Sequence, residues 1–206
     1  MHARSTTIQA RPDAIDDGVA HVRDVVMPAI LDMSGCVGLS MLADRQSGRC
    51  IVTTAWEDET AMRASAHAAG RLRDEAAKIF GGQPQVDEWE IAMLHRDHRA
   101  SAGACARVTW LRLDPDQLDR VTDVFSEAVL PAVSELDGFC SASLLLDRST
   151  SRCVGSVAYD SMDAMRRSTQ RADEIRASVV RDLGAERLDI GEFELAIAHL
   201  RVPEMA

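Results

Sequence analysis

The chain has 206 residues, of which 46% are hydrophobic and 27% charged, so it can bury a core and lacks the composition of a disordered protein. Its net charge of −10 argues against nucleic acids and anionic membranes as partners, because both would repel it. No apolar run approaches the roughly 20 residues of a membrane span, and the N-terminal MHARSTTIQARPD has no apolar signal core. We therefore expect a cytoplasmic protein.

The first half of the chain reads as strand, helix, hairpin, helix and strand. STTIQA (5–10) is a short strand that ends before Pro12, which opens a helix that Pro28 should bend. A hairpin with a polar turn at residues 46–48 follows, and the last strand is EWEIAMLH (88–95). Residues at spacings of three and four, all apolar except Ser65, form the inward stripes of the two helices: Ile15, Val19, Val22, Val26 and Ile30 in the first, and Met62, Ser65, Ala69, Leu72, Ala76 and Ile79 in the second.

The second half repeats this order 103 residues later. Pro12 aligns with Pro115 and Gly35 with Gly138, and after one inserted residue EFELAIAH (192–199) aligns with the last strand of the first half. The repeat indicates an internal duplication, which we divide into a first half at 1–97, a linker at 98–105 and a second half at 106–206.

Each half is predicted to be a ferredoxin-like β-α-β-β-α-β unit, an antiparallel sheet with helices on one face. The other sheet face of such a unit needs a partner, and two halves in one chain can supply it to each other. The predicted fold is therefore α+β, with two tandem halves packed sheet to sheet as a fused dimeric α+β barrel, an intrachain pseudo-dimer. The sequence leaves open whether whole chains associate further into a homodimer.

Two stretches carry a family resemblance. SGCVGLSMLADRQSGRCIVTTAWEDETAM (34–62) and DGFCSASLLLDRSTSRCVGSVAYDSMDAM (137–165) resemble the antibiotic biosynthesis monooxygenase superfamily. The resemblance implies oxygenase activity without metal, flavin or other cofactor on a hydrophobic or aromatic small molecule.

The heme-degrading branch of that superfamily depends on an Asn on the first strand and on a Trp and a His on the second helix. These positions fall, in the two halves, at Thr6 and Thr109, Ser65 and Ser168, and Asp74 and Ala177; a one-residue gap would move the first pair to Thr7 and Trp110. With the set absent, the resemblance implies that the chain does not degrade heme by that mechanism.

Histidines and cysteines do not indicate a metal site in the sequence. His95 and His199 recur at the ends of the last strands, whereas His98 has no counterpart, and no further ligands stand at metal spacing. We interpret these three as strand-end or linker residues rather than metal ligands, and His67 as a solvated residue rather than a catalytic base. Cys50 and its counterpart Cys153 read as small core residues. No residue is assigned a catalytic role.

The two halves differ in the sizes of residues expected to point inward. The first half has the smaller side chain at several matched positions, for example Val22 against Phe125 and Ala76 against Val179, so we expect the larger cavity there. The predicted pocket lies between the sheet and helices of the first half and binds a mostly apolar ligand; its residues are Thr6, Val22, Trp56, Met62, Ser65, Ala69 and Leu72.

Alternatives remain at the level of single residues and of function. Trp56 and its counterpart Tyr159 read either as core aromatics or as a ligand wall. Ser65 and its counterpart Ser168 read either as hydroxyls bonded to their own helix or as polar handles in a pocket. Besides an oxygenase, the sequence is compatible with a non-catalytic barrel that binds a small molecule, and with an interaction module.

Overall fold

The structure is a computed structural model that describes residues 1–200. Contacts divide the chain into two compact units. The first comprises Met1–Trp89 with the described residues from Glu194 onward, and the second comprises Glu90–Phe193. These units differ from the sequence repeats because the last strand of each half, β4 (Pro84–Arg96) and β8 (Glu186–Leu200), is divided between them.

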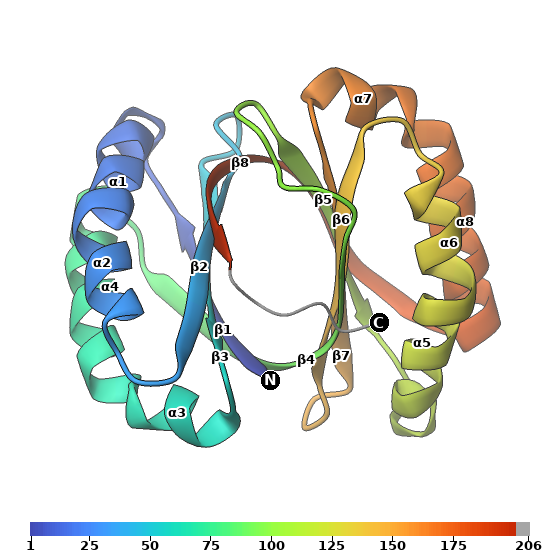
Figure 1. Cartoon of the computed structure of the whole chain (residues 1–206), viewed down its shortest axis with the longest axis horizontal. Helices are drawn as coiled ribbons and strands as arrows, with labels where there is room; N and C mark the ends of the chain where they lie inside the picture. Colours follow the sequence, from blue (N-terminus) through green and yellow to red (C-terminus); the bar gives the residue numbers. More distant parts are fainter. Residues whose placement is uncertain (201–206) are drawn as a thin grey trace. The chain divides into compact units, whose positions relative to one another are not determined.

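The first unit is an antiparallel sheet with helices on one face (Figure 1). Strand β3 pairs with β1 on one side and β2 on the other, and β2 also pairs with the end of β8, Leu39 lying opposite His199. The strands and helices that precede β4 are β1 (His2–Gln9), a 3-10 turn (Pro12–Ala14), α1 (Ile15–His21), a π-helical turn (Val22–Val26), α2 (Met27–Leu31), β2 (Cys36–Ala43), β3 (Arg49–Trp56), α3 (Glu59–Ala64) and α4 (Ala66–Phe80).

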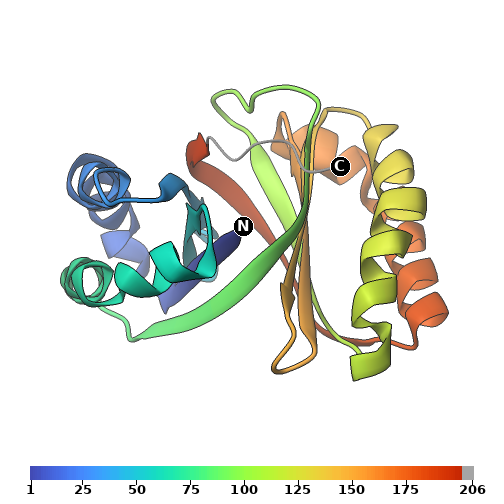
Figure 2. The ribbon, with the colours of Figure 1, turned by 60° about the horizontal axis from the view of Figure 1, so that its bottom comes forward.

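The second unit repeats this arrangement, with its helices side by side on one face of the strands (Figure 2). Strand β7 pairs with β5 and β6, and β6 also pairs with the end of β4, Ala142 lying opposite His95. Its strands and helices are β5 (Cys105–Arg112), a 3-10 turn (Pro115–Gln117), α5 (Leu118–Val124), a π-helical turn (Phe125–Val129), α6 (Leu130–Ser134), β6 (Phe139–Asp147), β7 (Arg152–Tyr159), α7 (Met162–Arg167) and α8 (Thr169–Leu183).

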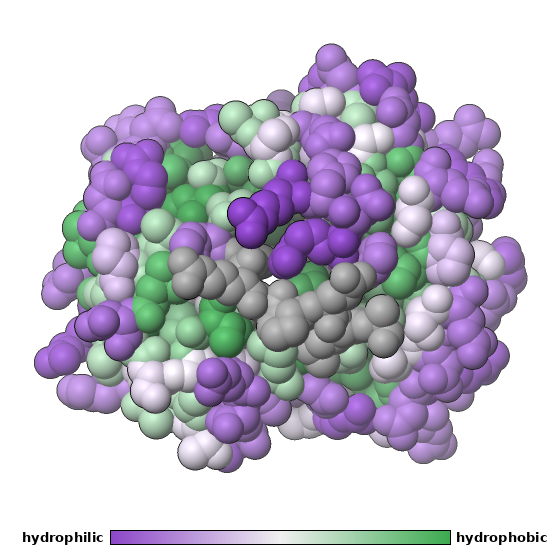
Figure 3. Space-filling model, viewed as in Figure 1, coloured by the Kyte–Doolittle hydropathy of each residue, from purple (hydrophilic) through white to green (hydrophobic). Residues whose placement is uncertain are grey.

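Hydrogen bonding orders the eight strands as a closed barrel, β1-β3-β2-β8-β5-β7-β6-β4. The predicted fold, two β-α-β-β-α-β halves in one antiparallel α+β barrel, is confirmed. The helices are amphipathic, and the space-filling view shows mostly polar residues on the outer side of α5, α6 and α8 (Figure 3). No helix within residues 1–200 is both long and apolar enough to cross a membrane.

The first helix of each half contains a π-helical turn immediately before its proline. The Met27 amide donates to the Val22 carbonyl, one residue further back than in an α-helix. The next residue, Pro28, has no N–H to donate, so the regular ladder cannot continue through it. The same turn precedes Pro131 in the second half. The first and last residues of these turns pack into the core of their half: Val22 and Val26 in the first, Phe125 and Val129 in the second.

The second helix of each half breaks at the serine of its inward stripe. α3 is capped by Asp58, whose carboxylate accepts from the Ala61 amide at 2.7 Å, and it ends at Ser65, where α4 begins. Ser161 caps α7 in the same way, and Ser168 marks the second break. We predicted one continuous helix here, whereas the structure divides it into a short helix and a 15-residue helix.

The duplicated cysteines are core residues, as predicted. Cys50 and Cys153 are buried, and burial raises the pKa of the Cys50 thiol to about 11 and that of Cys153 to about 12. Both thiols are therefore protonated and unreactive at neutral pH.

Candidate functional site

A cavity lies between sheet and helices at the equivalent place in each half. The first, of about 50 Å³, is bordered by β1, β3, the first helix and α4. The second, of about 80 Å³, is bordered by β5, β7, the first helix of its half and α8. A separate hollow of about 250 Å³ lies where α2 ends and β2 begins, lined by Leu31, Cys36, Val37 and His199.

The predicted pocket residues are only partly brought together. Thr6, Val22 and Ala69 line the first cavity. Trp56 and Met62 are buried in the core of the first half, and Leu72 packs against the same core. Ser65 is buried, and its hydroxyl donates to the Met62 carbonyl at 2.7 Å, which is the bond to its own helix that we considered as one alternative.

The prediction that the first half holds the larger of the two matched cavities is wrong. The comparison of inward residues missed Phe80, a fully buried ring in the first half whose counterpart is Leu183. It also missed Val52, which lines the first cavity where the second half has Gly155. A Cβ built on Gly155 meets no atom within 4 Å, so this glycine leaves open space in the second cavity. These two differences outweigh the bulk of Phe125 and Val179.

A buried arginine stands at the same position in both cavities. Arg4 and its counterpart Arg107 project from the first strand of each half, with only 5% and 3% of their surfaces exposed. Each binds a glutamate of the last strand with two N–H groups: Glu88 at 2.9 and 2.7 Å, and Glu192 at the same distances. A buried guanidinium needs such a partner, because desolvation without one is very costly.

The two arginines differ in the hydrogen bonding of their Nη1 atoms. In the first half, Nη1 of Arg4 donates to the Ser65 hydroxyl at 3.0 Å, which satisfies the guanidinium. In the second half the Ser168 hydroxyl donates to the Ala164 carbonyl instead. Thr169 accepts a bond from Nη2 of Arg107 at 2.9 Å, and Nη1 is left buried without a hydrogen-bond partner within the part of the chain that the structure describes. An unsatisfied buried donor costs about 1–3 kcal/mol, so it favours a ligand that accepts a hydrogen bond.

A second arginine and a tyrosine complete the polar part of the second cavity. Burial and the nearby Arg107 lower the pKa of Arg176 to about 10, and Arg176 forms an ion pair with Asp173. The Tyr159 ring lies 5.9 Å from the Arg107 guanidinium, and burial raises the pKa of its hydroxyl. Apart from Thr109, the other described residues that line this cavity are apolar. Two arginines in the wall of a mostly apolar cavity form a site for an anionic or electron-rich oxygen.

The arginines were missed in the sequence, although a signal for them exists. Arg4, Thr6 and Ile8 alternate along β1 and all line the first cavity, as Arg107, Thr109 and Leu111 line the second. A charged residue that recurs at an inward strand position is uncommon, and it indicates a built site more directly than a comparison of side-chain volumes does.

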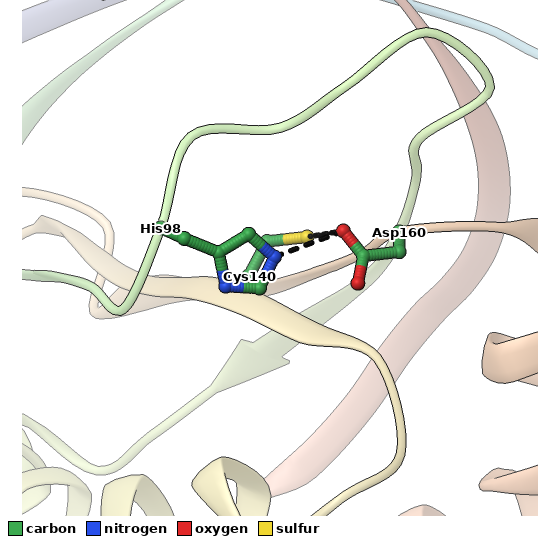
Figure 4. A group of neighbouring side chains, drawn as sticks. All are labelled: His98, Cys140 and Asp160. Atoms are coloured by element: carbon green, nitrogen blue, oxygen red, sulfur yellow. Dashed lines mark hydrogen bonds and ion pairs between the residues drawn. The ribbon is translucent and has the colours of Figure 1, made fainter.

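The histidines lie outside both cavities. His67 is exposed, as predicted, and His95 stacks on Phe139 with ring centroids 6.2 Å apart. His98 meets two residues from distant parts of the second half, Cys140 and Asp160, and their ligand atoms all lie within 4.8 Å of one another. Sequence spacing could not reveal this group, which is shown in Figure 4.

Comparison with known proteins identifies the family. Residues 1–72 match the family model described as antibiotic biosynthesis monooxygenase. The chain belongs to this family. An uncharacterized protein from Mycobacterium tuberculosis is 57% identical to this chain over 206 residues, which cover 100% of this chain and 87% of that protein.

Two solved structures show the family fold over the whole chain. A candidate monooxygenase from Fusobacterium nucleatum superposes with a TM-score of 0.71 at 13% identity, covering 99% of this chain and 95% of that one. An anthrone oxidase-like protein superposes with a TM-score of 0.66 at 12% identity, covering 100% and 95%. At such identities the likeness concerns the fold alone.

In this chain, the positions that correspond to the heme-degrading residues lie in different environments. Thr6 and Thr109 line the two cavities, and Ser65 and Ser168 are buried at the helix breaks. Asp74 and Ala177 are exposed, so the position that carries the histidine in that branch faces solvent in both halves.

Proposed function

We propose that the protein is a cofactor-independent monooxygenase whose substrate, a small aromatic molecule with an ionisable ketone or phenol oxygen, binds in the cavity of the second half. The observation that carries the proposal is the buried Nη1 of Arg107, a donor without a hydrogen-bond partner among the described residues, in the wall of a mostly apolar cavity. Family membership and the monooxygenase-like structures with the same fold support oxygen chemistry. On the sequence argument given above, we place this activity in the cytoplasm.

Arg107 would make the substrate reactive by stabilising its oxyanion. A hydrogen bond from a buried guanidinium to an enolate or phenolate oxygen lowers the pKa of the bound substrate, because the charge is offset where water is excluded. None of the described lining residues carries a carboxylate or an imidazole, so the proton leaves to solvent. Tyr159 and Phe125 offer ring surfaces to the aromatic part of the substrate.

The electrons come from the substrate itself. For a methylene group beside an aromatic ketone, the carbanion reduces dioxygen and a carbon–oxygen bond forms. The oxygen–oxygen bond then breaks, one oxygen atom stays as a new carbonyl and the other leaves as water with the two hydrogens of the methylene group. This balance needs no external reductant, so the protein has only to orient the substrate and exclude water.

The size of the cavity sets a condition on binding. A cavity of roughly 150 Å³ holds one benzene ring, which is more than the 80 Å³ available here. A bound ring therefore has to displace side chains of α8, where Ile175 and Val179 are only half-buried. A series of a single-ring quinol, a naphthol and anthrone would show how far the cavity opens.

The test combines oxygen uptake with binding measured by thermal shift. We expect the wild-type protein to accelerate oxygen uptake with at least one of the three compounds over a protein-free control. Arg107→Met should lower the rate by about a hundredfold or more, the loss typical of removing a preorganised donor. Arg4→Met is the matched control, because it removes the same ion pair from the first half and leaves the second cavity intact.

Gly155→Val is the sharper variant, since it fills the second cavity with the residue that the first half carries at Val52. We expect it to abolish binding without loss of stability, because its Cβ meets no atom within 4 Å. Unchanged binding by Gly155→Val, or equal loss of activity in Arg107→Met and Arg4→Met, would contradict the proposed site. Binding that depends on Gly155 and Arg107 without oxygen uptake would favour the alternative, a non-catalytic barrel for small molecules.

A further inference from the structure

A second group of chemically capable side chains lies outside the cavity, where the connection between β4 and β5 meets the edge of β6 and β7. Asp160 directly follows β7, Cys140 lies in β6, and His98 directly follows Asp97 in the connection. Nε2 of His98 is 2.9 Å from Oδ1 of Asp160, and the Cys140 sulfur is 3.2 Å from the same oxygen (Figure 4).

The backbone holds the three residues in this position. The amides of Asp97 and His98 both donate to the carbonyl of Cys140, at 2.9 and 3.4 Å, and the Asp160 amide donates to the Gly138 carbonyl at 2.8 Å. Cys140 is the extra residue of a β-bulge, because the pairing register between β6 and β7 shifts between Phe139 and Ser141. A bulge redirects the side chain it carries, here toward His98 and Asp160.

His98 is also oriented by a further carboxylate. Its Nδ1 lies 2.8 Å from Oδ2 of Asp97, which fixes the ring and leaves Nε2 facing Asp160 and Cys140. Metal-binding histidines usually hold their second ring nitrogen against a carboxylate, a backbone carbonyl or water, and Asp97 supplies the first of these here. Ion pairs with Asp97 and Asp160 would account for the position of His98 by themselves, but the Cys140 thiol adds a third ligand type to the group.

From this geometry we propose that His98, Cys140 and Asp160 bind a divalent zinc-type ion, with Asp97 as the residue that positions His98. Ligand atoms around a tetrahedral zinc, at 2.0 to 2.3 Å from the metal, stand roughly 3.3 to 3.8 Å from each other. The pairs here, at 2.9 Å, 3.2 Å and at most 4.8 Å, bracket that spacing, so movements of about 1 Å or less suffice. Nitrogen, sulfur and oxygen donors together suit zinc rather than calcium or magnesium, and a water molecule would complete the coordination.

The first half lacks this set and thereby supplies matched substitutions. The residues aligned with Cys140 and Asp160 are Val37 and Glu57, and Val37 occupies the same bulge in β2. Cys140→Val therefore places in β6 a residue that the equivalent bulge already accommodates. Cys36→Val removes another partly accessible thiol, away from the proposed site, and serves as the control.

The test uses the full-length protein after treatment with a chelator. Cobalt(II) should bind with one equivalent and give the near-ultraviolet charge-transfer band of a cobalt–thiolate bond together with the intense visible bands of tetrahedral coordination, and zinc should displace it. Cys140→Val should abolish the thiolate band, whereas Cys36→Val should retain it. Asp97→Asn should keep the band and weaken affinity by about 10- to 100-fold, the usual effect of losing such a positioning carboxylate.

Circular dichroism and thermal melting of each variant establish that it is folded. The proposal is overturned if the wild-type protein shows no cobalt–thiolate band at millimolar cobalt, or if Cys140→Val keeps both the band and the affinity. Neither readout depends on oxygenase activity, so this result is independent of the function proposed for the cavity.

Discussion

The internal duplication offers a direct test of how the first half packs its cavity side. Gly18 lies in α1 against Phe80 at the end of α4, and a Cβ built on Gly18 would stand 2.0 Å from Cε1 of Phe80 and 2.4 Å from two further ring atoms. The aligned residues in the second half are Val121 and Leu183, both buried. In the first half a glycine on the first helix faces the large Phe80, whereas in the second half the larger Val121 faces the smaller Leu183.

This complementarity predicts strong coupling between the two positions. Gly18→Val alone should destabilise the protein by about 2 to 3 kcal/mol, the upper part of the overpacking range, because the fully buried ring has nowhere to go. The gain in helix propensity from replacing glycine is below about 0.5 kcal/mol and does not offset this. Phe80→Leu alone should cost about 1 to 2 kcal/mol through the void it leaves. The double variant reproduces the pair found in the second half and should lie within about 1 kcal/mol of the wild type.

The assay is urea denaturation of the wild-type protein, both single variants and the double variant at one temperature. The predicted coupling energy, the sum of the two single costs less the cost of the double variant, is about 2 to 5 kcal/mol and favourable. Leu183→Phe is a parallel variant in the second half, where Val121 should make the larger ring destabilising as well. Additive effects of the two substitutions, or a Gly18→Val variant as stable as the wild type, would refute the packing argument.

Burial alone would raise the pKa of Asp147, but hydrogen bonds from Ser149, Thr150 and Arg152 hold this pKa at about 2. The charged carboxylate therefore adds roughly 2 kcal/mol of stability, which is present above pH 4 and lost as the pH falls toward 2. Asp147→Asn should show this loss of stability in thermal melts at pH 7 and approach the wild type near pH 2. A fragment of residues 1–97 should dimerise, or else aggregate, in analytical ultracentrifugation. In the fragment β2 loses its partner β8 and the end of β4 loses its partner β6, so β2 of one copy can pair with β4 of a second copy. A stable monomer at micromolar concentration would contradict the intrachain pseudo-dimer. Heme with a reductant should give no ring cleavage beyond a protein-free control, followed as loss of the Soret band with tetrapyrrole release, since the residues of that reaction are replaced in both halves.

The duplication, the order of strands and helices and the barrel could all be predicted from the sequence, because each depends on local periodicity and on a pattern written twice. Alternation along strands and three-to-four spacing along helices are set by backbone geometry, so they survive in the order of residues. Pro28 and Gly35, with their counterparts Pro131 and Gly138, mark the bend and the end of the first helix in both halves for the same reason. The burial of Cys50 and Cys153 followed from the same pattern.

The content of the cavities was decided only by the tertiary structure. Phe80 and Gly155 control the volumes through neighbours far away in the chain, and packing is too dense for a few aligned pairs to determine which space stays open. Nη1 of Arg107 has no partner among the described residues because Ser168 bonds to the Ala164 carbonyl, whereas Ser65 accepts from Arg4 in the first half. His98, Cys140 and Asp160 are separated by 20 residues or more in sequence, and a β-bulge with two backbone hydrogen bonds brings them together. Hydrogen bonds and ligand geometry act between residues that are near in space, so a sequence without the fold could not show them.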